Sequence, residues 1–141
     1  MVINGGITEI DQAIGHLEKV DGVMVGREAY QNPWSRAKVD EMLFDSRPDR
    51  KSRFDVLDRY KQYMEAQLGK GVPLKRLARH LLGLFQGQPG ARVWRRALSD
   101  EAFRARADLS AIESAEHQLD AVLEKHVASA EIPEPQMEQS A

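Results

Sequence analysis

A corner rich in glycine and proline, residues 86–90, separates two short amphipathic segments and limits what this part of the chain can fold into. In the second segment Trp94, Ala97 and Leu98 share one face of a helix. The apolar residues of the first segment recur at helical spacing and are Leu74, Leu77, Ala78, Leu81, Leu82 and Phe85. Both stripes must be buried, so we predict two helices folded back on each other.

The opposite sides of both segments carry cations. In the second segment Arg92, Arg95 and Arg96 lie at the spacing that brings side chains together on a helix. The first segment contributes Lys75, Arg76, Arg79 and His80. Cations gathered with few acids suit a phosphate backbone. The alternative is that they only solvate the outer face of the hairpin.

The charge distribution bears on this choice. The chain has a net charge of −2, but residues 50–106 contain 14 basic and 5 acidic residues, whereas the remainder contains 6 basic and 17 acidic. A basic segment within an otherwise acidic protein favours a nucleic-acid partner.

Composition bounds the rest. With 141 residues, of which 42% are hydrophobic, the chain can bury one modest core. It has no cysteine, and its four histidines form no ligand-like cluster, so we expect no metal site. No apolar run approaches the roughly 20 residues that span a membrane, and the N-terminus lacks a signal-peptide pattern. We therefore expect a cytoplasmic protein with no membrane partner.

The first 27 residues read as strand, Gly-rich turn, helix, strand and Gly-Arg turn. Thr8 is the expected N-cap of a helix that runs through Leu17. A right-handed crossover makes the strands parallel, which places both turns at one edge of the sheet. There, backbone N–H groups and a guanidinium would converge on one phosphate, as after the last strands of many (β/α)8 barrels. The residues concerned are Asn4, Gly5, Gly6, Gly26 and Arg27. The alternative is that the glycines only form tight turns.

Two strands and one helix cannot cover both faces of a sheet. We therefore expect residues 1–45 to be the incomplete C-terminal end of a TIM barrel, and the sequence to start in the middle of a domain. Tyr30, Pro33 and Trp34 would close the last barrel turn.

Residues 46–49 read as a linker, and residues 50–127 as a helical bundle. A long helix from Arg50 ends at the glycines of 69–71, Ser99 and Asp100 cap a further segment, and a last helix extends to Val127. Residues 128–141 are expected to form a disordered tail. The predicted fold class is mostly α, with a β-α-β remnant of a (β/α)8 barrel followed by the bundle.

Three stretches together resemble the C-terminal part of tRNA-dihydrouridine synthase, A subfamily. They are INGGI at residues 3–7, DGVMVGREAYQNPW at 21–34, and the run at 79–96, RHLLGLFQGQPGARVWRR. The last run is the narrowest of these signatures. The resemblance extends from about residue 2 to residue 98.

The resemblance implies an enzyme that reduces D-loop uridine of tRNA, at positions 20 and 20a, with FMN as cofactor and NADPH as hydride donor. It assigns the FMN phosphate to the glycine turns and Arg27, and contacts with tRNA to Arg92 and Arg95. The family's catalytic cysteine, which protonates the uracil, has no counterpart in this sequence. We therefore expect the chain by itself to be inactive.

Two other interpretations stay open at this point. In the first, the chain is a non-catalytic RNA-binding helical module. In the second, it is the end of another FMN-dependent TIM-barrel oxidoreductase. The basic bundle and the 79–96 run argue against the second.

Overall fold

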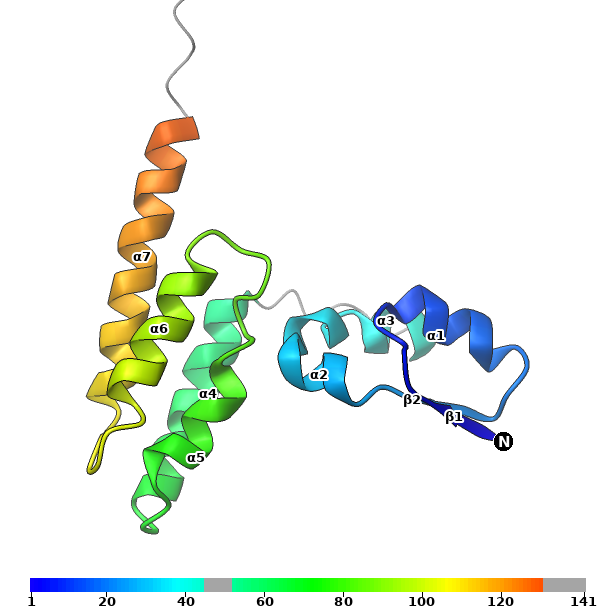
Figure 1. The fold of residues 1–141 in the computed structure, drawn as a ribbon, viewed down its shortest axis with the longest axis horizontal. Coiled ribbons are helices and arrows are strands. Elements are labelled where there is room, and N and C mark those ends of the chain that lie inside the picture. The colour runs from blue at the N-terminus through cyan, green and yellow to red at the C-terminus, as the bar shows by residue number, and fades with distance from the viewer. Residues whose placement is uncertain (45–51, 131–141) are drawn as a thin grey trace, which may run out of the picture.

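The chain forms two parts, seen in Figure 1 as a β-α unit and a helical bundle. The computed structural model describes residues 1–44 and 52–130. The expected linker at 46–49 and most of the expected tail therefore lie outside the described residues.

The β-α unit begins with two short parallel strands joined through a helix. Ile3 of β1 pairs with Val23 of β2, which confirms the predicted parallel crossover. The elements of this part, in order, are β1 (Val2–Asn4), α1 (Ile10–Leu17), β2 (Gly22–Met24), α2 (Arg27–Gln31), a 3₁₀ helix (Pro33–Arg36) and α3 (Val39–Phe44).

The N-cap of α1 is Glu9, so the prediction of Thr8 is wrong by one residue. The Glu9 side chain accepts from the backbone of Gln12, and Gln12 Oε1 accepts from the Glu9 N–H at 3.5 Å. The capping box therefore consists of the Glu9 carboxylate and the Gln12 amide. The predicted box used the hydroxyl of Thr8 in place of the Glu9 carboxylate.

The β-α unit leaves apolar surface uncovered. Within the described residues 1–44, the buried hydrophobic side chains are Ile7 and Ala13, whereas Val2 is 65% exposed and Met24 is 48% exposed. This agrees with the argument that two strands and one helix cannot cover both faces of a sheet.

The bundle contains the main core. Its elements are α4 (Arg53–Leu68), α5 (Leu74–Ala78), a 3₁₀ helix (Arg79–Leu81), α6 (Ala91–Glu101) and α7 (Ser110–Ala130). Its largest fully buried side chains come from α4, α6, α7 and the stretch before α6, and they are Trp94, Phe85, Leu57, Met64, Leu98, Ile112 and Leu119. The predicted bundle of amphipathic helices is confirmed.

An ion pair ties the first and last helices of the bundle together. Lys61 Nζ lies 2.8 Å from Glu116 Oε2 and 2.7 Å from Asp58 Oδ1. Burial opposes the charged lysine, but these hydrogen bonds and the two negative charges outweigh it, so the pKa of Lys61 is raised.

Two expectations about helix ends are wrong. Ser99 and Asp100 do not cap a new segment, because α6 continues through them to Glu101. Residues 128–130 belong to α7 and not to a disordered tail. The end of this helix projects beyond the other helices in Figure 1, and Val127 there is 57% exposed.

The first segment of the predicted hairpin is only partly helical. The α-helix stops at Ala78, and the chain continues through a 3₁₀ helix and successive turns to Gly90. Its expected apolar stripe is nevertheless buried, apart from Leu82, which is half-buried.

Side-chain donors account for the break. Trp94 Nε1 donates to Leu81 O at 2.8 Å, and Arg53 Nη1 donates to Leu84 O at 2.6 Å and to Gln86 O at 3.1 Å. The Tyr60 hydroxyl donates to Leu77 O at 3.2 Å. These bonds to α4 and α6 supplement local turn bonds such as Leu84 N–H to Leu81 O at 3.0 Å, so the segment does not need a continuous α-helical ladder to satisfy its carbonyls.

We predict that Trp94→Ala lowers the free energy of unfolding by about 3–5 kcal/mol, because a fully buried indole leaves a cavity. Trp94→Phe should cost less, about 1–3 kcal/mol, since it keeps most of the packing and removes only one of two donors to Leu81 O, which still accepts from Leu84 N–H at 3.0 Å. Urea denaturation of both variants measures the difference. Equal, small losses would contradict this account of the core.

Candidate functional site

The glycine turns that follow the two strands meet at one cavity of about 370 Å³. All five residues predicted to hold a phosphate line it, namely Asn4, Gly5, Gly6, Gly26 and Arg27. The structure therefore brings together the complete predicted set, from the ends of β1 and β2 and the start of α2.

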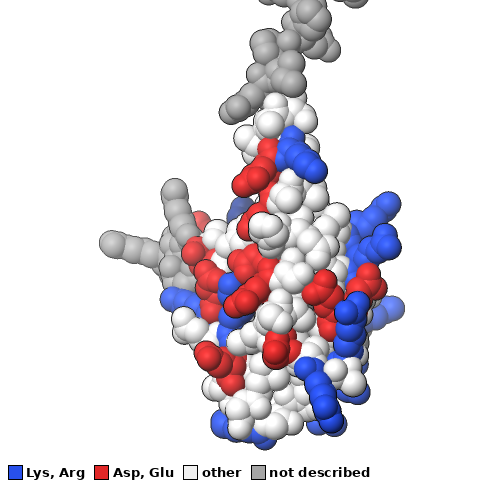
Figure 2. Space-filling view, turned by 90° about the vertical axis from the view of Figure 1, so that its left-hand side faces the viewer, with Lys and Arg blue, Asp and Glu red and all other residues white. Residues whose placement is uncertain are grey.

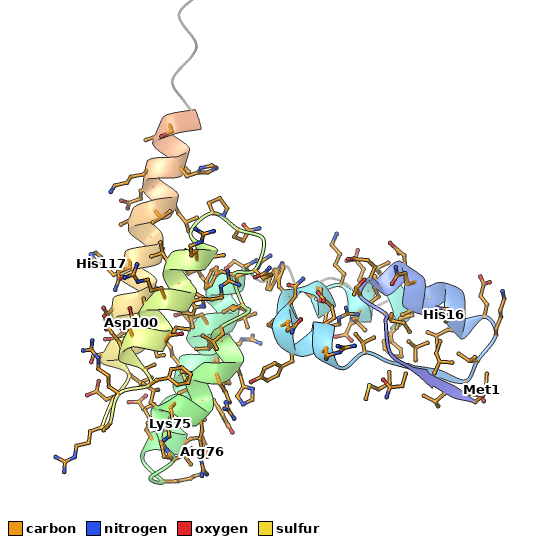
Figure 3. The ribbon with its side chains drawn as sticks, viewed as in Figure 1. Met1, His16, Lys75, Arg76, Asp100 and His117 are labelled. Atoms are coloured by element: carbon orange, nitrogen blue, oxygen red, sulfur yellow. The ribbon has the colours of Figure 1, made fainter. Side chains whose placement is uncertain are left out.

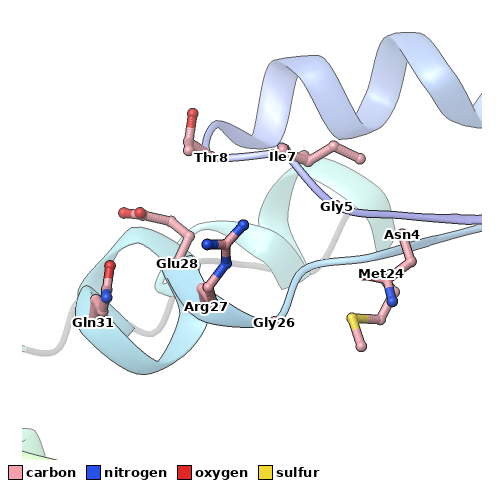
Figure 4. Close-up of a pocket in the computed structure, with 10 residues that line it drawn as sticks. Asn4, Gly5, Ile7, Thr8, Met24, Gly26, Arg27, Glu28 and Gln31 are labelled. Atoms are coloured by element: carbon pink, nitrogen blue, oxygen red, sulfur yellow. The ribbon is translucent and has the colours of Figure 1, made fainter.

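We call this the phosphate cavity, after the ligand predicted for it. Its geometry suits an anion. Gly5 and Gly6 have positive φ angles of 110° and 70°, and a Cβ at either position would meet no atom within 4 Å. Figure 4 shows the exposed Arg27 guanidinium projecting toward the turn after β1, with Glu28 beside it. One cation and open backbone thus face the cavity, together with one carboxylate that the sequence analysis did not foresee.

A second cavity, of about 460 Å³, lies where the β-α unit meets the bundle. Arg79 and Arg95, two of the predicted RNA-binding residues, line it opposite Tyr30 and Gln31. We call it the junction cavity. Glu28 and Gln31 line both this cavity and the phosphate cavity, so α2 forms a wall common to the two.

Close backbone packing forms the junction. A Cβ on Gly83 would overlap the Gln31 carbonyl oxygen and would lie 2.7 Å from the carbonyl carbon and 3.0 Å from Pro33 Cδ. The rings of Tyr30 and His80 meet edge to face, with centroids 5.8 Å apart. Because Gly83 has no side chain, the backbone of Gln31 in the β-α unit can pack directly against it.

Trp34 also belongs to the junction. It packs against the bundle core, and the Arg53 guanidinium lies 5.1 Å from the centroid of its ring. Burial lowers the pKa of Arg53, yet the guanidinium stays protonated at neutral pH because its ordinary pKa is so high. Trp34 was predicted only to close a barrel turn. The sequence carried no signal of this partner, since Arg53 belongs to the other part of the chain.

The predicted RNA-binding cations are all exposed, but they occupy several places. Arg92, Arg95 and Arg96 lie on α6 away from buried Trp94. Arg95 Nη1 donates to Gln86 Oε1 at 3.1 Å, and Arg96 Nε lies 3.6 Å from Asp100 Oδ2. Arg96 is therefore partly neutralised, whereas Arg95 is held toward the junction cavity.

The first hairpin segment distributes its cations differently. Arg79 lines the junction cavity, and His80 contacts Tyr30. Lys75 and Arg76 lie at the far end of the bundle, as Figure 3 shows. Figure 2 shows acidic side chains across one face of the bundle, with Lys and Arg at its edge and lower end.

Two classes of feature are missing from the described parts of the chain. Residues 1–44 and 52–130 contain no group of three His, Cys, Asp or Glu side chains placed to hold a metal ion. No helix in the same ranges is long and apolar enough to cross a membrane.

Residues 1–123 match the family described as dihydrouridine synthase (Dus). The chain belongs to the dihydrouridine synthase family. This membership excludes the alternative that the chain ends a different flavin barrel.

This chain is similar to several curated proteins named tRNA-dihydrouridine(20/20a) synthase. It is 50% identical over 113 residues to that of Shewanella oneidensis, covering 80% of this chain and 34% of the relative. Identity to the protein of Escherichia coli K12 is 49% over 115 residues, covering 82% and 33%. Identity to the protein of Vibrio parahaemolyticus is 45% over 115 residues, covering 82% and 35%. The chain thus spans about a third of the length of these relatives.

We predict that Gly83→Ala separates the β-α unit from the bundle, because the added methyl group has no room against Gln31 and Pro33. The free energy of unfolding should fall by about 1–3 kcal/mol, and amide hydrogen exchange should accelerate across residues 27–36. Gly15→Ala is the matched control, since a Cβ there meets nothing within 4 Å and alanine suits the interior of α1. Unchanged exchange in Gly83→Ala would contradict the packing described.

Proposed function

We propose that this chain acts as the C-terminal part of a tRNA-dihydrouridine synthase, in which it holds the phosphate end of FMN and grips tRNA. The observation that carries the proposal is the wall formed by α2. Glu28 and Gln31 of this helix line both the phosphate cavity and the junction cavity with its two arginines. A cofactor and a nucleic acid would therefore be held side by side.

The phosphate cavity fits the phosphate of FMN. Its open glycine backbone can approach the oxygens closely, and the Arg27 guanidinium supplies a positive charge and several donors. The residues we assign to FMN are Asn4, Gly5, Gly6, Gly26 and Arg27. A bound flavin would supply the hydride chemistry, with NADPH as the donor. The chain's own residues would anchor and orient it.

The basic side of the bundle would hold tRNA near its D-loop. Arg79 and Arg95 face the junction, while Arg92 and Arg96 extend the positive surface along α6. Lys75, Arg76 and His80 complete the proposed set. Enzymes that modify a base within folded RNA extrude it from its stack, and firm contacts with the flanking backbone support that extrusion.

The relatives' names give the substrate positions, 20 and 20a. We propose the same positions for the enzyme to which this chain contributes. The chain has no cysteine to protonate uracil, so the reaction would need residues beyond those present here. The exposed apolar side chains of β1 and β2 would pack within a larger (β/α)8 barrel, and a tRNA substrate implies the cytoplasm.

We predict that FMN binds this chain only weakly, through its phosphate, and that inorganic phosphate competes for the site. Arg27→Ala should abolish the competition, whereas Lys38→Ala, which removes an equal charge from an exposed position outside the cavity, should not. Flavin fluorescence titration measures both. A tight complex with quenched fluorescence would show that ring contacts, and not the phosphate, dominate.

The RNA contacts lead to a second expectation. The Arg92→Ala/Arg95→Ala pair should weaken tRNA binding without unfolding the bundle, because both side chains point away from the core. The slope of log K against log salt should flatten by roughly 0.7–0.9 for each phosphate that the variant no longer neutralises. The charge-matched control is Lys38→Ala/Lys125→Ala, two exposed lysines, one before α3 and one on α7. Equal affinities and slopes in all three proteins would show that the arginines only solvate the surface.

A further inference from the structure

A third cavity, of about 530 Å³, lies at the end of the bundle remote from the junction. It is formed where the connection from α4 to α5 meets the connection from α6 to α7. Leu68, Val72 and Leu74 supply an apolar floor that continues into the bundle core. Its lining shares no residue with the phosphate cavity or the junction cavity. We call it the distal cavity.

The rim of the distal cavity is positively charged. Lys75, Arg104 and Arg106 line it, and all three are exposed. Of the described residues that line it, none is acidic. Within the described ranges none of the three cations is paired with a carboxylate. Arg104 and Arg106 also border a smaller adjoining cavity that Glu101 and Asp108 line, but the distal cavity itself presents three cations and no carboxylate, which favours an anionic ligand.

The backbone of Arg106 is strained at this rim. Its φ angle is 65°, and it is the one non-glycine residue with positive φ among those described. The left-handed region is unfavourable for residues that bear a Cβ, whereas glycine enters it freely. Such outliers gather at ligand-binding sites. Here the residue with the outlying φ angle lines the cavity.

An aromatic ring stands beside these cations. Phe103 lines the distal cavity and is 40% exposed. Exposed aromatic rings next to basic side chains stack unpaired bases while the cations hold the phosphates. The cavity volume lies within the range of about 300–1,000 Å³ that is typical of small-ligand sites, which suits one nucleotide and not a duplex.

We propose that the distal cavity binds one unpaired nucleotide of an RNA, with its base against Phe103 and its phosphate between Arg106, Arg104 and Lys75. The proposal rests on the proposed function in that the RNA is a tRNA. It adds a second point of contact, at the end of the bundle opposite the junction.

The central test is Arg106→Gly in the full 141-residue chain. Glycine relieves the backbone strain, so the variant should be at least as stable as the wild type in thermal unfolding. Its affinity for tRNA should nevertheless fall about 3- to 10-fold at low salt, and the salt slope should flatten by roughly 0.7–0.9. Arg106→Lys keeps the charge and should stay within about twofold of the wild type. A merely structural role would not produce a gain in stability together with a loss of binding.

A second arm tests the base. Phe103→Leu keeps an apolar side chain but removes the stacking surface, so it should weaken binding of a short single-stranded RNA and leave an RNA duplex of equal length unaffected. Equal losses for both RNAs would overturn the nucleotide pocket in favour of a general phosphate contact. The proposal would also be overturned if Arg106→Gly weakened binding to anionic lipid vesicles and left binding to RNA unchanged.

The Arg92→Ala/Arg95→Ala pair separates the two proposals. If this pair weakens tRNA binding while Arg106→Gly does not, the distal site is wrong and the proposed function stands. If the wild-type chain does not bind tRNA at all, the proposed function and the distal site both fail.

Discussion

The described structure depends on how the backbone carbonyls between residues 77 and 86 find their donors. Tyr60, Arg53 and Trp94 supply those donors from α4 and α6. In the described residues no buried side-chain nitrogen or oxygen lacks a partner. Because the segment after Leu81 is held by turns and long-range bonds and not by an α-helix, it can turn Gly83 toward the β-α unit. The junction cavity exists because of that turn.

The helix α2 forms a wall common to the phosphate cavity and the junction cavity. It starts at the glycine of the second strand turn and ends against the backbone around Gly83. One short helix therefore links the proposed cofactor anchor to the proposed RNA contacts. A shift of the bundle against the β-α unit would move Glu28 and Gln31, and so would change the shape of both cavities together.

Local patterns predicted the features that local physics determines. The parallel strands, the convergence of the glycine turns with Arg27 and the burial of Trp94 all follow from periodicity and crossover geometry. The family was predicted correctly from three short sequence runs, at residues 3–7, 21–34 and 79–96. The end of α5 at Ala78 could not be predicted, because the competing donors lie far away in the sequence. The same holds for the stacking of Arg53 on Trp34 and for the distal cavity, where two connections meet.

The separation of charge has a consequence for how the molecule would approach the proposed RNA. Acidic residues such as Glu113 and Glu124 lie on α7, and Figure 2 shows an acidic face bordered by cations. With a net charge of only −2, the chain as a whole is barely drawn toward or away from a polyanion. Its dipole, however, experiences a torque in the field of the phosphates, which turns the basic end forward before contact. Orientation during diffusion, rather than overall attraction, would then govern the association rate.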